Sequence, residues 1–461
     1  MAIPNHPTTQ QAESLFAQGL QFHSQGEFAL AMQTYEQVLK LEPKHFEALH
    51  HVGIVAFQTG NYELAAGFIR SALAVDPGHA GAHGNLGNAL REMQHLEEAL
   101  RSYGRALELT GGDGDTWYNR GVALQALQRN DEALHSYDQA LALNPADDQA
   151  WNNRASVLRQ LKQLEAALHS VEQALAVNPG NPEAYNNGGA ILHAMGQLDD
   201  AAACYRRALE LAPDYADALC NLARLCLSRL DFEQALQCCS TAVSLDPGLA
   251  QAYCLRADAL RGLNRNGEAR QDSAHADALQ RQRVAAYRKL GGELQQQGRP
   301  ESAARLFAAA LELDQSDAGL WQLHARMLNA AGRREQALDS IDRALALVPD
   351  SADYHVTRGA ILRASLRYGE AQQCYEKAVQ LAPHHPGAYT NLGSLLDQVG
   401  QAELAMAHYE RAIALDPDCA LAHWNRSLVH LRRGDYEQGW RGYEWRWKAE
   451  TLGVYLSLIH I

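Results

Sequence analysis

The 461-residue sequence lacks the features that would place it in a membrane or on nucleic acid. Basic residues are in the minority, 40 against 54 acidic ones, so the chain would repel phosphate backbones and anionic lipid head groups. Nowhere are eighteen consecutive residues apolar, and the N-terminus has no basic region followed by an apolar run, so neither a membrane-spanning helix nor a secretory signal is predicted. We therefore expect a cytoplasmic protein with no nucleic-acid partner and no membrane partner.

Motifs of catalysis and metal binding are missing as well. The sequence has no HExxH, GxxxxGKS/T or GxSxG, and no GxGxxG between a strand and a helix. The eight cysteines include no CxxC pair, which fits a reducing compartment, and those between residues 220 and 254 offer no short-spaced pair from which a zinc site could start. We interpret the twenty histidines as solvated surface. We expect no catalytic residue, no metal and no cofactor in this chain.

Proline is scarce but regularly placed. Nine of the fourteen prolines are separated by 34 residues or by multiples of 34, namely Pro43, Pro77, Pro145, Pro179, Pro213, Pro247, Pro349, Pro383 and Pro417. Twelve residues before these positions, and before three equivalent positions without proline, stand Ala31, Ala65, Ala99, Ala133, Ala167, Ala201, Ala235, Ala269, Ala303, Ala337, Ala371 and Ala405. Twenty-four residues before them only glycine or alanine occurs, from Gly19 to Gly393. The chain is therefore an array of 34-residue repeats.

Each repeat is predicted to be a pair of helices. Apolar residues recur at intervals of three and four. Gly60, Gly196, Gly332 and Gly400 stand midway through their repeats, where a left-handed residue can end one helix before the next begins. The two columns of small residues mark points at which the helices cross closely. One such hairpin cannot bury its apolar stripe alone, so neighbouring repeats must stack into a solenoid.

This pattern resembles the tetratricopeptide repeat family over thirteen successive units, residues 12–453. The family's large apolar position is filled by Tyr35, Tyr103, Tyr137, Tyr205, Phe307, Tyr375 and Tyr409. The resemblance implies an all-α fold, a right-handed α-solenoid with a concave groove lined by the first helices.

The eighth unit, residues 250–283, departs most from the pattern. Ser273 stands in the aromatic position and Arg281 in place of proline, and from Gly267 to Leu290 nothing ends a helix. We expect one long helix or a bend there. The expected segments are an N-terminal tail at 1–11, repeats 1–8 at 12–283, repeats 9–12 at 284–419, a degenerate terminal repeat at 420–453, and an unstructured or truncated tail at 454–461.

Asparagine recurs two residues before the glycine or alanine column. This asparagine column consists of Asn85, Asn119, Asn153, Asn187, Asn221, Asn391 and Asn425. An amide can take up the N–H and C=O of a peptide together, so the column could hold an extended chain without reading its sequence. It resembles the groove of the O-linked N-acetylglucosamine transferases, whose repeat asparagines bind substrate polypeptide. In the alternative interpretation, asparagine is common at this place in the family and bonds locally to the neighbouring helix.

A clamp for C-terminal carboxylates, as in co-chaperone repeat domains, is not predicted. It needs lysines and asparagines combined in the groove. The positions that would hold its basic residues are Gly84, Tyr118, Asn152, Asn186 and Cys220.

Aromatic residues make up only 7% of the chain but gather in the stretch 434–448. Tyr436, Trp440, Tyr443 and Trp447 are spaced by four, three and four residues, which places them on one face of a single predicted helix, the second of unit thirteen. One interpretation is a terminal cap that folds back on its own repeat. The other is a docking face for a following domain, because this repeat resembles the last repeat of bacterial proteins in which a tetratricopeptide array leads into a glycosyltransferase domain.

The sequence thus predicts a scaffold rather than an enzyme, since a shallow groove does not hold converging side chains away from water. We expect a protein or peptide partner, bound as an extended polypeptide in the groove. The alternative is the substrate-recruiting arm of a bacterial glycosyltransferase whose catalytic domain lies beyond residue 461.

Overall fold

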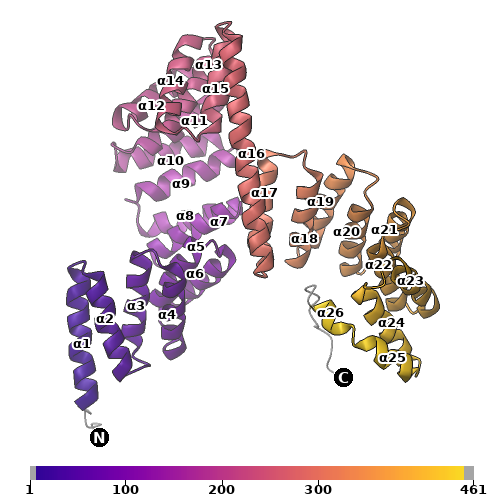
Figure 1. The fold of residues 1–461 in the computed structure, drawn as a ribbon. Helices are drawn as coiled ribbons and strands as arrows, with labels where there is room; N and C mark the ends of the chain where they lie inside the picture. The colour runs from indigo at the N-terminus through magenta and orange to yellow at the C-terminus, as the bar shows by residue number, and fades with distance from the viewer. Residues whose placement is uncertain (1–6, 451–461) are drawn as a thin grey trace. The chain divides into compact units, whose positions relative to one another are not determined.

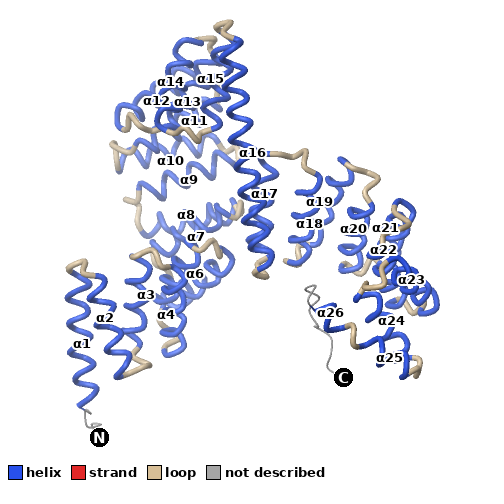
Figure 2. Tube along the Cα trace, viewed as in Figure 1, coloured by secondary structure: helices blue, strands red, loops and turns tan. Residues whose placement is uncertain are grey.

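The computed structural model describes residues 7–450, and in this range the chain forms helices joined by turns and no strand (Figures 1 and 2). The helices up to α15 are α1 (Pro7–Ser24), α2 (Phe28–Leu41), α3 (Phe46–Gln58), α4 (Tyr62–Val75), α5 (Ala80–Glu92), α6 (Leu96–Thr110), α7 (Gly114–Ala126), α8 (Asn130–Leu143), α9 (Asp148–Gln160), α10 (Leu164–Val177), α11 (Pro182–Ala194), α12 (Leu198–Leu211), α13 (Ala216–Ser228), α14 (Phe232–Leu245) and α15 (Ala250–Gly262). The others are α16 (Asn266–Gln296), α17 (Pro300–Leu313), α18 (Ala318–Ala330), α19 (Arg334–Leu347), α20 (Ala352–Ala364), α21 (Tyr368–Leu381), α22 (Pro386–Gln398), α23 (Ala402–Leu415), α24 (Ala420–Arg432), α25 (Tyr436–Tyr443) and α26 (Arg446–Glu450). In this described range no helix has both the length and the apolar composition needed to cross a membrane.

The chain divides into two compact units, residues 1–279 and 280–461, and the boundary falls inside α16. In the first unit the hairpins α1–α2 to α13–α14 follow one another (Figure 1). Inside the stack, a first helix packs on the second helix of its own hairpin and on helices of the preceding and following hairpins, as α5 does with α6, α4 and α7. The second unit has the same arrangement from α18–α19 to α24–α25. A stack of this kind is an α-solenoid, and the predicted all-α solenoid fold is confirmed.

The long helix expected between Gly267 and Leu290 is confirmed by α16, which has 31 residues. Arg281 keeps the backbone N–H that a proline would lack, so the helical hydrogen bonds continue through this position. Gly267 is also not among the glycines with a left-handed backbone. The second helix of repeat eight therefore meets neither a proline nor a left-handed residue that would end it, although the left-handed Asn264 still separates it from α15.

The small-residue columns lie where the helices of a hairpin cross. All twelve alanines of the alanine column are buried. Most glycines of this column face an aromatic ring of the second helix, whereas Gly53 faces Ile69, and a Cβ added to Gly121 would lie 2.6 Å from the Tyr137 ring. The same approach recurs at Gly19, Gly87, Gly189, Gly291, Gly359 and Gly393. Where alanine replaces glycine, as at Ala155, the matching residue of the second helix is not aromatic but Val171.

The turns inside the hairpins use left-handed residues. The predicted turn glycines Gly60, Gly196, Gly332 and Gly400 have φ between 78° and 83°. The equivalent position in other hairpins has φ near 60° without glycine, at Gln94, Gln128, Lys162, Leu230, Asn264 and Leu366. An L side chain in this conformation costs on the order of 1 kcal/mol, so these turns are strained where the glycine turns are not.

The two ends differ from the expected pattern. α1 begins at Pro7, within the segment expected to be an N-terminal tail. The prediction of a single helix through the aromatic stretch is wrong, because α25 ends at Tyr443 and α26 begins at Arg446. The turn between them places Trp445 on His423 of α24, with the ring planes 7° apart and the centroids at 4.1 Å. The tail expected at 454–461 lies outside the described residues.

Candidate functional site

Two pockets of the first unit are lined by the asparagine column. The smaller, of about 380 Å³, lies between α5 and α7 and includes Asn85 and Asn119. The larger, of about 480 Å³, lies among α9, α11 and α13 and includes Asn187 and Asn221. We call them the α5–α7 pocket and the α9–α13 pocket. Four of the seven predicted residues thus line a pocket, which is the placement that a binding role requires.

The starts of the first helices position these asparagines. Asp113 precedes α7 and accepts a hydrogen bond from Thr116 N at 3.1 Å, and Asn181 precedes α11 and accepts one from Ala184 N at 3.0 Å. Such N-caps satisfy backbone N–H groups that have no partner within the helix. Because the cap fixes where each helix begins, the asparagine comes at the same turn in each repeat.

The side-chain amides bond to the neighbouring first helix. In four of the seven cases Nδ2 contacts the side chain that stands 35 residues earlier, in the preceding repeat. The pairs are Asn85 with His50 Nε2 at 3.0 Å, Asn153 with Tyr118 Oη at 3.1 Å, Asn187 with Asn152 Oδ1 at 2.8 Å, and Asn221 with Asn186 Oδ1 at 3.0 Å. Local bonding to the neighbouring helix, the alternative interpretation of the column, therefore occurs at these four residues.

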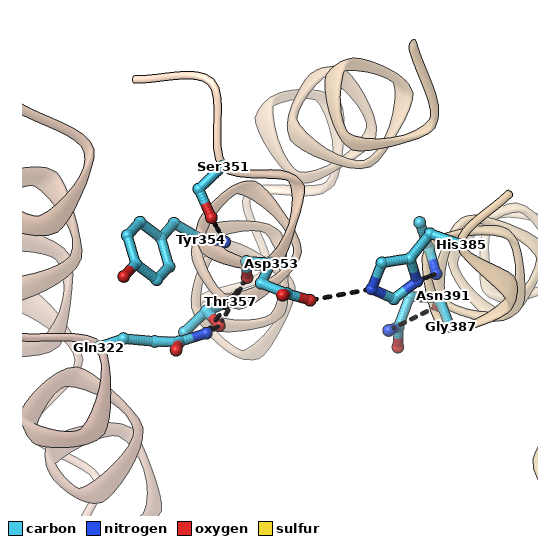
Figure 3. Close-up of polar contacts among 9 residues, drawn as sticks. Gln322, Ser351, Asp353, Tyr354, Thr357, His385, Gly387 and Asn391 are labelled. Carbon is cyan, nitrogen blue, oxygen red and sulfur yellow. Dashed lines mark hydrogen bonds and ion pairs between the residues drawn. The ribbon is translucent and has the colours of Figure 1, made fainter. Parts of the chain in front are cut away.

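At two of the other asparagines the residue 35 positions earlier cannot accept this inter-repeat bond. For Asn119 that residue is Gly84 and for Asn391 it is Val356, and neither side chain can accept a hydrogen bond. Asn391 Nδ2 turns back instead to Gly387 O, at 3.0 Å, on its own helix (Figure 3).

In the second unit, other polar side chains form the hydrogen bonds between neighbouring first helices. Gln322 of α18 donates from Nε2 to Thr357 Oγ1 of α20 at 2.9 Å, and Thr357 stands at the position of the asparagine column (Figure 3). The carboxylate Oδ1 of Asp353 in α20 lies 2.9 Å from Nε2 of His385, the residue that precedes α22. The link between neighbouring first helices is thus preserved although the asparagines are interrupted.

The asparagine amides keep bonding capacity for a ligand. Within residues 7–450, no protein donor reaches the amide oxygens of Asn85, Asn153 and Asn187, and Asn425 makes no side-chain hydrogen bond. Asn119 Oδ1 accepts from Arg91 Nη1 at 2.7 Å, which leaves its NH₂ group available. Each of these amides could therefore bind one further peptide group.

The two pockets differ in charge. The charged groups of the α5–α7 pocket are Asp113 and Asp115. Those of the α9–α13 pocket are Arg159, Arg224 and Asp217, together with the titratable His193. Burial and the positive charge of Arg224 lower the pKa of His193, so its imidazole is neutral at pH 7. The α5–α7 pocket is therefore negative and the α9–α13 pocket positive.

The interpretation of the histidines as solvated surface is wrong for His50. Its side chain is buried, and its ring lies 5.2 Å from that of His79 and 5.7 Å from that of Phe46. Burial, followed by the nearby His51 and His79, lowers the pKa of His50 to about 4. His50 is buried because it occupies the position that Asn85 contacts from the next repeat.

Four cysteines of the first unit, Cys220, Cys226, Cys238 and Cys239, are buried and pack as small core residues, whereas Cys254 is exposed. Burial raises the pKa of the Cys239 thiol to about 12 and those of Cys220 and Cys238 to about 11, so these thiols stay protonated and unreactive. Among the residues that the structure describes, no three His, Cys, Asp or Glu side chains come together as metal ligands would.

The charged residues of the pockets were missed by the sequence analysis. The signal was nevertheless present, because Arg91 and Arg159 stand at the same position of repeats two units apart. Arginine does not form a continuous column there, since glutamine and histidine occupy the position in the repeats that follow.

The aromatic residues near the C-terminus remain largely exposed. Tyr436 is 64% exposed, Trp440 59% and Trp447 56%. Tyr443 is half-buried, with its ring 5.6 Å from that of Trp440 and 4.5 Å from the guanidinium of Arg446. The four predicted docking residues therefore lie on two helices, and three of them offer apolar surface to solvent.

Family models of the tetratricopeptide repeat match residues 16–80, 80–113, 114–147, 136–169, 171–203, 189–228, 216–249, 294–361 and 350–418. No curated protein matches the chain.

Similar solved structures include YrrB, described as a TPR protein with an unusual peptide-binding site, at 23% identity over 40% of this chain and 95% of that chain, with a TM-score of 0.37. Pseudomonas aeruginosa PilF is 24% identical over 45% of this chain and 94% of its own, with a TM-score of 0.40. A tetratricopeptide repeat protein from Parabacteroides merdae is 18% identical over 54% and 99%, with a TM-score of 0.45. The family-model matches together cover more than half of the sequence, and several begin where α5, α7 and α13 begin; the chain belongs to the tetratricopeptide repeat family.

Proposed function

We propose that this chain is a protein-interaction scaffold that binds an extended polypeptide along its first helices. The main support is the pair of pockets lined by the asparagine column. Amides, tyrosine hydroxyls and charged groups make up most of their polar lining. Small-molecule sites, in contrast, are mostly apolar and enclose their ligand. Groups of this kind suit the repeated N–H and C=O groups of a main chain.

The inter-repeat bonds assist such binding. Asn187 is held by Asn152, and Asn221 is held by both Asn186 and Arg224. A side chain that is already fixed loses less rotamer freedom when a ligand arrives. Local bonding and polypeptide binding are therefore compatible uses of the same amides.

The test replaces Asn119, Asn153, Asn187 and Asn221 with alanine. We expect binding of unrelated peptides to weaken to a similar degree, because the amides contact main-chain groups. The melting temperature should fall, since four inter-repeat hydrogen bonds at about 1 kcal/mol each are lost, while the helical circular dichroism at 25 °C is retained. Asn266→Ala is the control, because Asn266 is exposed and lies on α16 away from both pocket linings. Loss of the fold, or unchanged peptide binding, would contradict the proposal.

A second candidate function, the arm of a glycosyltransferase whose catalytic domain follows this chain, has one supporting observation. Tyr436, Trp440 and Trp447 are each more than half exposed, whereas a terminal cap would bury them. Each such ring would contribute on the order of 2 kcal/mol when covered by another domain. Exposed apolar patches often mark interaction sites.

The test of this docking face is the double change Trp440→Ala and Trp447→Ala. We expect less self-association in sedimentation and an unchanged melting temperature, because each of these rings is more than half exposed. Trp445→Ala is the matched control. Trp445 stacks on His423, so its loss should lower the melting temperature. A sharply lowered melting temperature in the double variant, without any change in self-association, would identify the tryptophans as an internal cap.

A further inference from the structure

Five histidines lie close together where the first two hairpins meet α5. This histidine cluster consists of His23, His45, His50, His51 and His79. The ring centroids are 6.2 Å apart for His23 and His51, 5.9 Å for His51 and His50, and 5.2 Å for His50 and His79. His45 joins this row through the ring of Phe16, which lies 5.2 Å from His45 and 5.3 Å from His51. The cluster therefore connects repeats one, two and three.

Three of these rings accept a hydrogen bond from a group that can only donate. Asn85 Nδ2 of α5 donates to His50 Nε2 at 3.0 Å. The backbone N–H three residues further along donates to His45 Nδ1 at 3.2 Å and to His79 Nδ1 at 3.0 Å. A ring nitrogen accepts only while it carries no proton, so all three bonds require a neutral imidazole. Protonation would place two donors face to face and would break each bond.

His45 and His79 also stand at helix N-termini, since His45 precedes α3 and His79 precedes α5. The free N–H groups at this end of a helix already give it a partial positive charge, so a further positive charge is unfavourable there. Protonation of these two rings would therefore remove the cap and add an electrostatic repulsion.

Little negative charge faces the cluster. The charged groups that act on His50 are His51 and His79, and those that act on His51 are Glu47 of the same helix and His23 of α1. Tyr35 of α2 has its ring 5.7 Å from that of His51, and burial raises the pKa of Tyr35 to about 12, so it is uncharged. Within the described residues, neither α4 nor α5 brings a carboxylate into an ion pair with the cluster. Protonated rings would therefore repel one another with little compensation.

His385 in the second unit provides a comparison within the chain. It caps α22 in the same way, by accepting a hydrogen bond from Ala388 N at 3.1 Å, but its Nε2 lies 2.9 Å from the carboxylate of Asp353. A nearby carboxylate favours the protonated imidazole. His50 has no carboxylate among the groups that act on it, so acid should disturb the histidine cluster more than the start of α22.

We propose that the histidine cluster is an acid-sensitive switch: below about pH 5 its protonation opens the contact between α3 and α5 and loosens α1 to α4, while the repeats that follow stay folded. This inference does not depend on the proposed polypeptide binding. Because Asn85 also lines the α5–α7 pocket, opening would remove part of the wall of that pocket.

The direction of the effect follows from the protons bound. Burial, together with the nearby His51 and His79, lowers the pKa of His50 from 6.5 to about 4, and burial also lowers the pKa of His51. The closed state thus binds fewer protons than the open state between these pH values. The contribution of His50 to the stability of this end is complete above pH 6.5 and declines as the pH falls towards 4. For His50 alone, opening becomes about 50-fold more favourable at pH 4.5 than at pH 7.

The experiment is hydrogen exchange of the whole 461-residue chain at pH 7 and pH 4.5, expressed as protection factors so that the intrinsic pH dependence of exchange is removed. We expect protection in α1 to α5 to fall by about 50-fold and to return when the pH is restored to 7. Protection in α9 and α10 should change far less. An equal loss in α9 and α10, or unchanged protection in α1 to α5, would overturn the inference.

Asparagine variants assign the effect to the histidines. Later repeats have Asn152 and Asn186 at the position of His50, and Asn181 at the position of His45 and His79; all three accept the equivalent hydrogen bond through Oδ1. The triple variant His45→Asn, His50→Asn and His79→Asn should therefore keep its protection at pH 7 and lose far less of it at pH 4.5.

His50→Asn alone should reduce the acid-induced loss severalfold, and this single variant tests the inference even where the triple variant fails to fold. His385→Asn is the matched control and should leave the acid response of α1 to α5 unchanged. A loss of protection in His50→Asn as large as in the original chain would refute the inference.

Discussion

The Gly121–Tyr137 pair allows a test of whether the first helices need glycine because the aromatic rings of the second helices approach so closely. A Cβ added to Gly121 would lie 2.6, 2.8 and 3.0 Å from three ring carbons of Tyr137, well inside the 3.5–4.0 Å of normal carbon contact. The ring is fully buried, and its hydroxyl donates to Gln125 Oε1 at 2.9 Å, so it cannot move away without losing that bond. Overpacking of this kind costs about 1–3 kcal/mol.

The same substitution has a favourable part, because alanine stabilises a helix by roughly 0.5–1 kcal/mol relative to glycine. We expect Gly121→Ala to destabilise repeat four by about 1–2 kcal/mol. In the Tyr137→Val background the clash is gone, as at Ala155 and Val171, and the same change should stabilise by roughly 0.5–1 kcal/mol. The double-mutant cycle should therefore show a coupling energy of about 1.5–3 kcal/mol.

Hydrogen exchange measures this locally, through peptides that cover α7 and α8, and a thermal melt reports on the whole chain. Gly104→Ala is the matched control, because Gly104 lies in a helix and nothing stands within 4 Å of its added Cβ; it should stabilise α6. A Gly121→Ala effect of the same size in both backgrounds would refute the argument, since the ring would then not be what glycine accommodates.

Three further predictions follow from the backbone and from burial. Leu366→Gly should stabilise its turn by roughly 0.5–1 kcal/mol, because φ is 61° there and the side chain is 71% exposed; a lower midpoint in urea would contradict this. The pKa of His50 is lowered from 6.5 to about 4 on folding, so the folded state binds fewer protons. Stability is then complete above pH 6.5 and falls by about 3 kcal/mol as the pH drops towards 4, and His50→Gln should flatten the melting temperature between pH 6.5 and 4.5. Amides of α15 and α16 should exchange faster than those of α9 to α12, because repeat eight has Ser273 in place of a packed ring; slower exchange there would count against a weak repeat.

The fold could be predicted from the sequence because each structural rule recurs many times. A single buried alanine signifies little, but Ala31 and its equivalents in twelve of the thirteen repeats indicate the same crossing of two helices. The long helix α16 was predicted from the loss of two helix-ending residues, which is again a local property. The break between α25 and α26 was not, because it accompanies the stacking of Trp445 on His423, a contact between helices that spacing along one helix cannot reveal.

The candidate site was predicted only in part. The asparagine column could be found, since each member repeats the same residue at the same place. Bonding to the neighbouring helix was one of the two interpretations of this column, but the individual partners could not be predicted, because they differ from one repeat to the next. Arg159 was missed although the sequence shows Glu92 after Arg91 and Gln160 after Arg159. That Arg159 Nε is buried without a hydrogen-bond partner in the described part of the chain is visible only in the structure.

The asparagines therefore differ in what they can do for a ligand, although they share one position in the repeat. Asn187 is held by Asn152 through its NH₂ group and offers its oxygen, whereas Asn119 is held through its oxygen by Arg91 and offers its NH₂ group. Asn391 bonds to its own helix and is not held by a neighbour. A polypeptide would thus meet acceptors at one repeat and donors at another. The pattern of these groups, rather than the number of asparagines, should set where along the first helices a main chain is bound most tightly, and it favours the first unit, where the neighbours that hold the amides are polar.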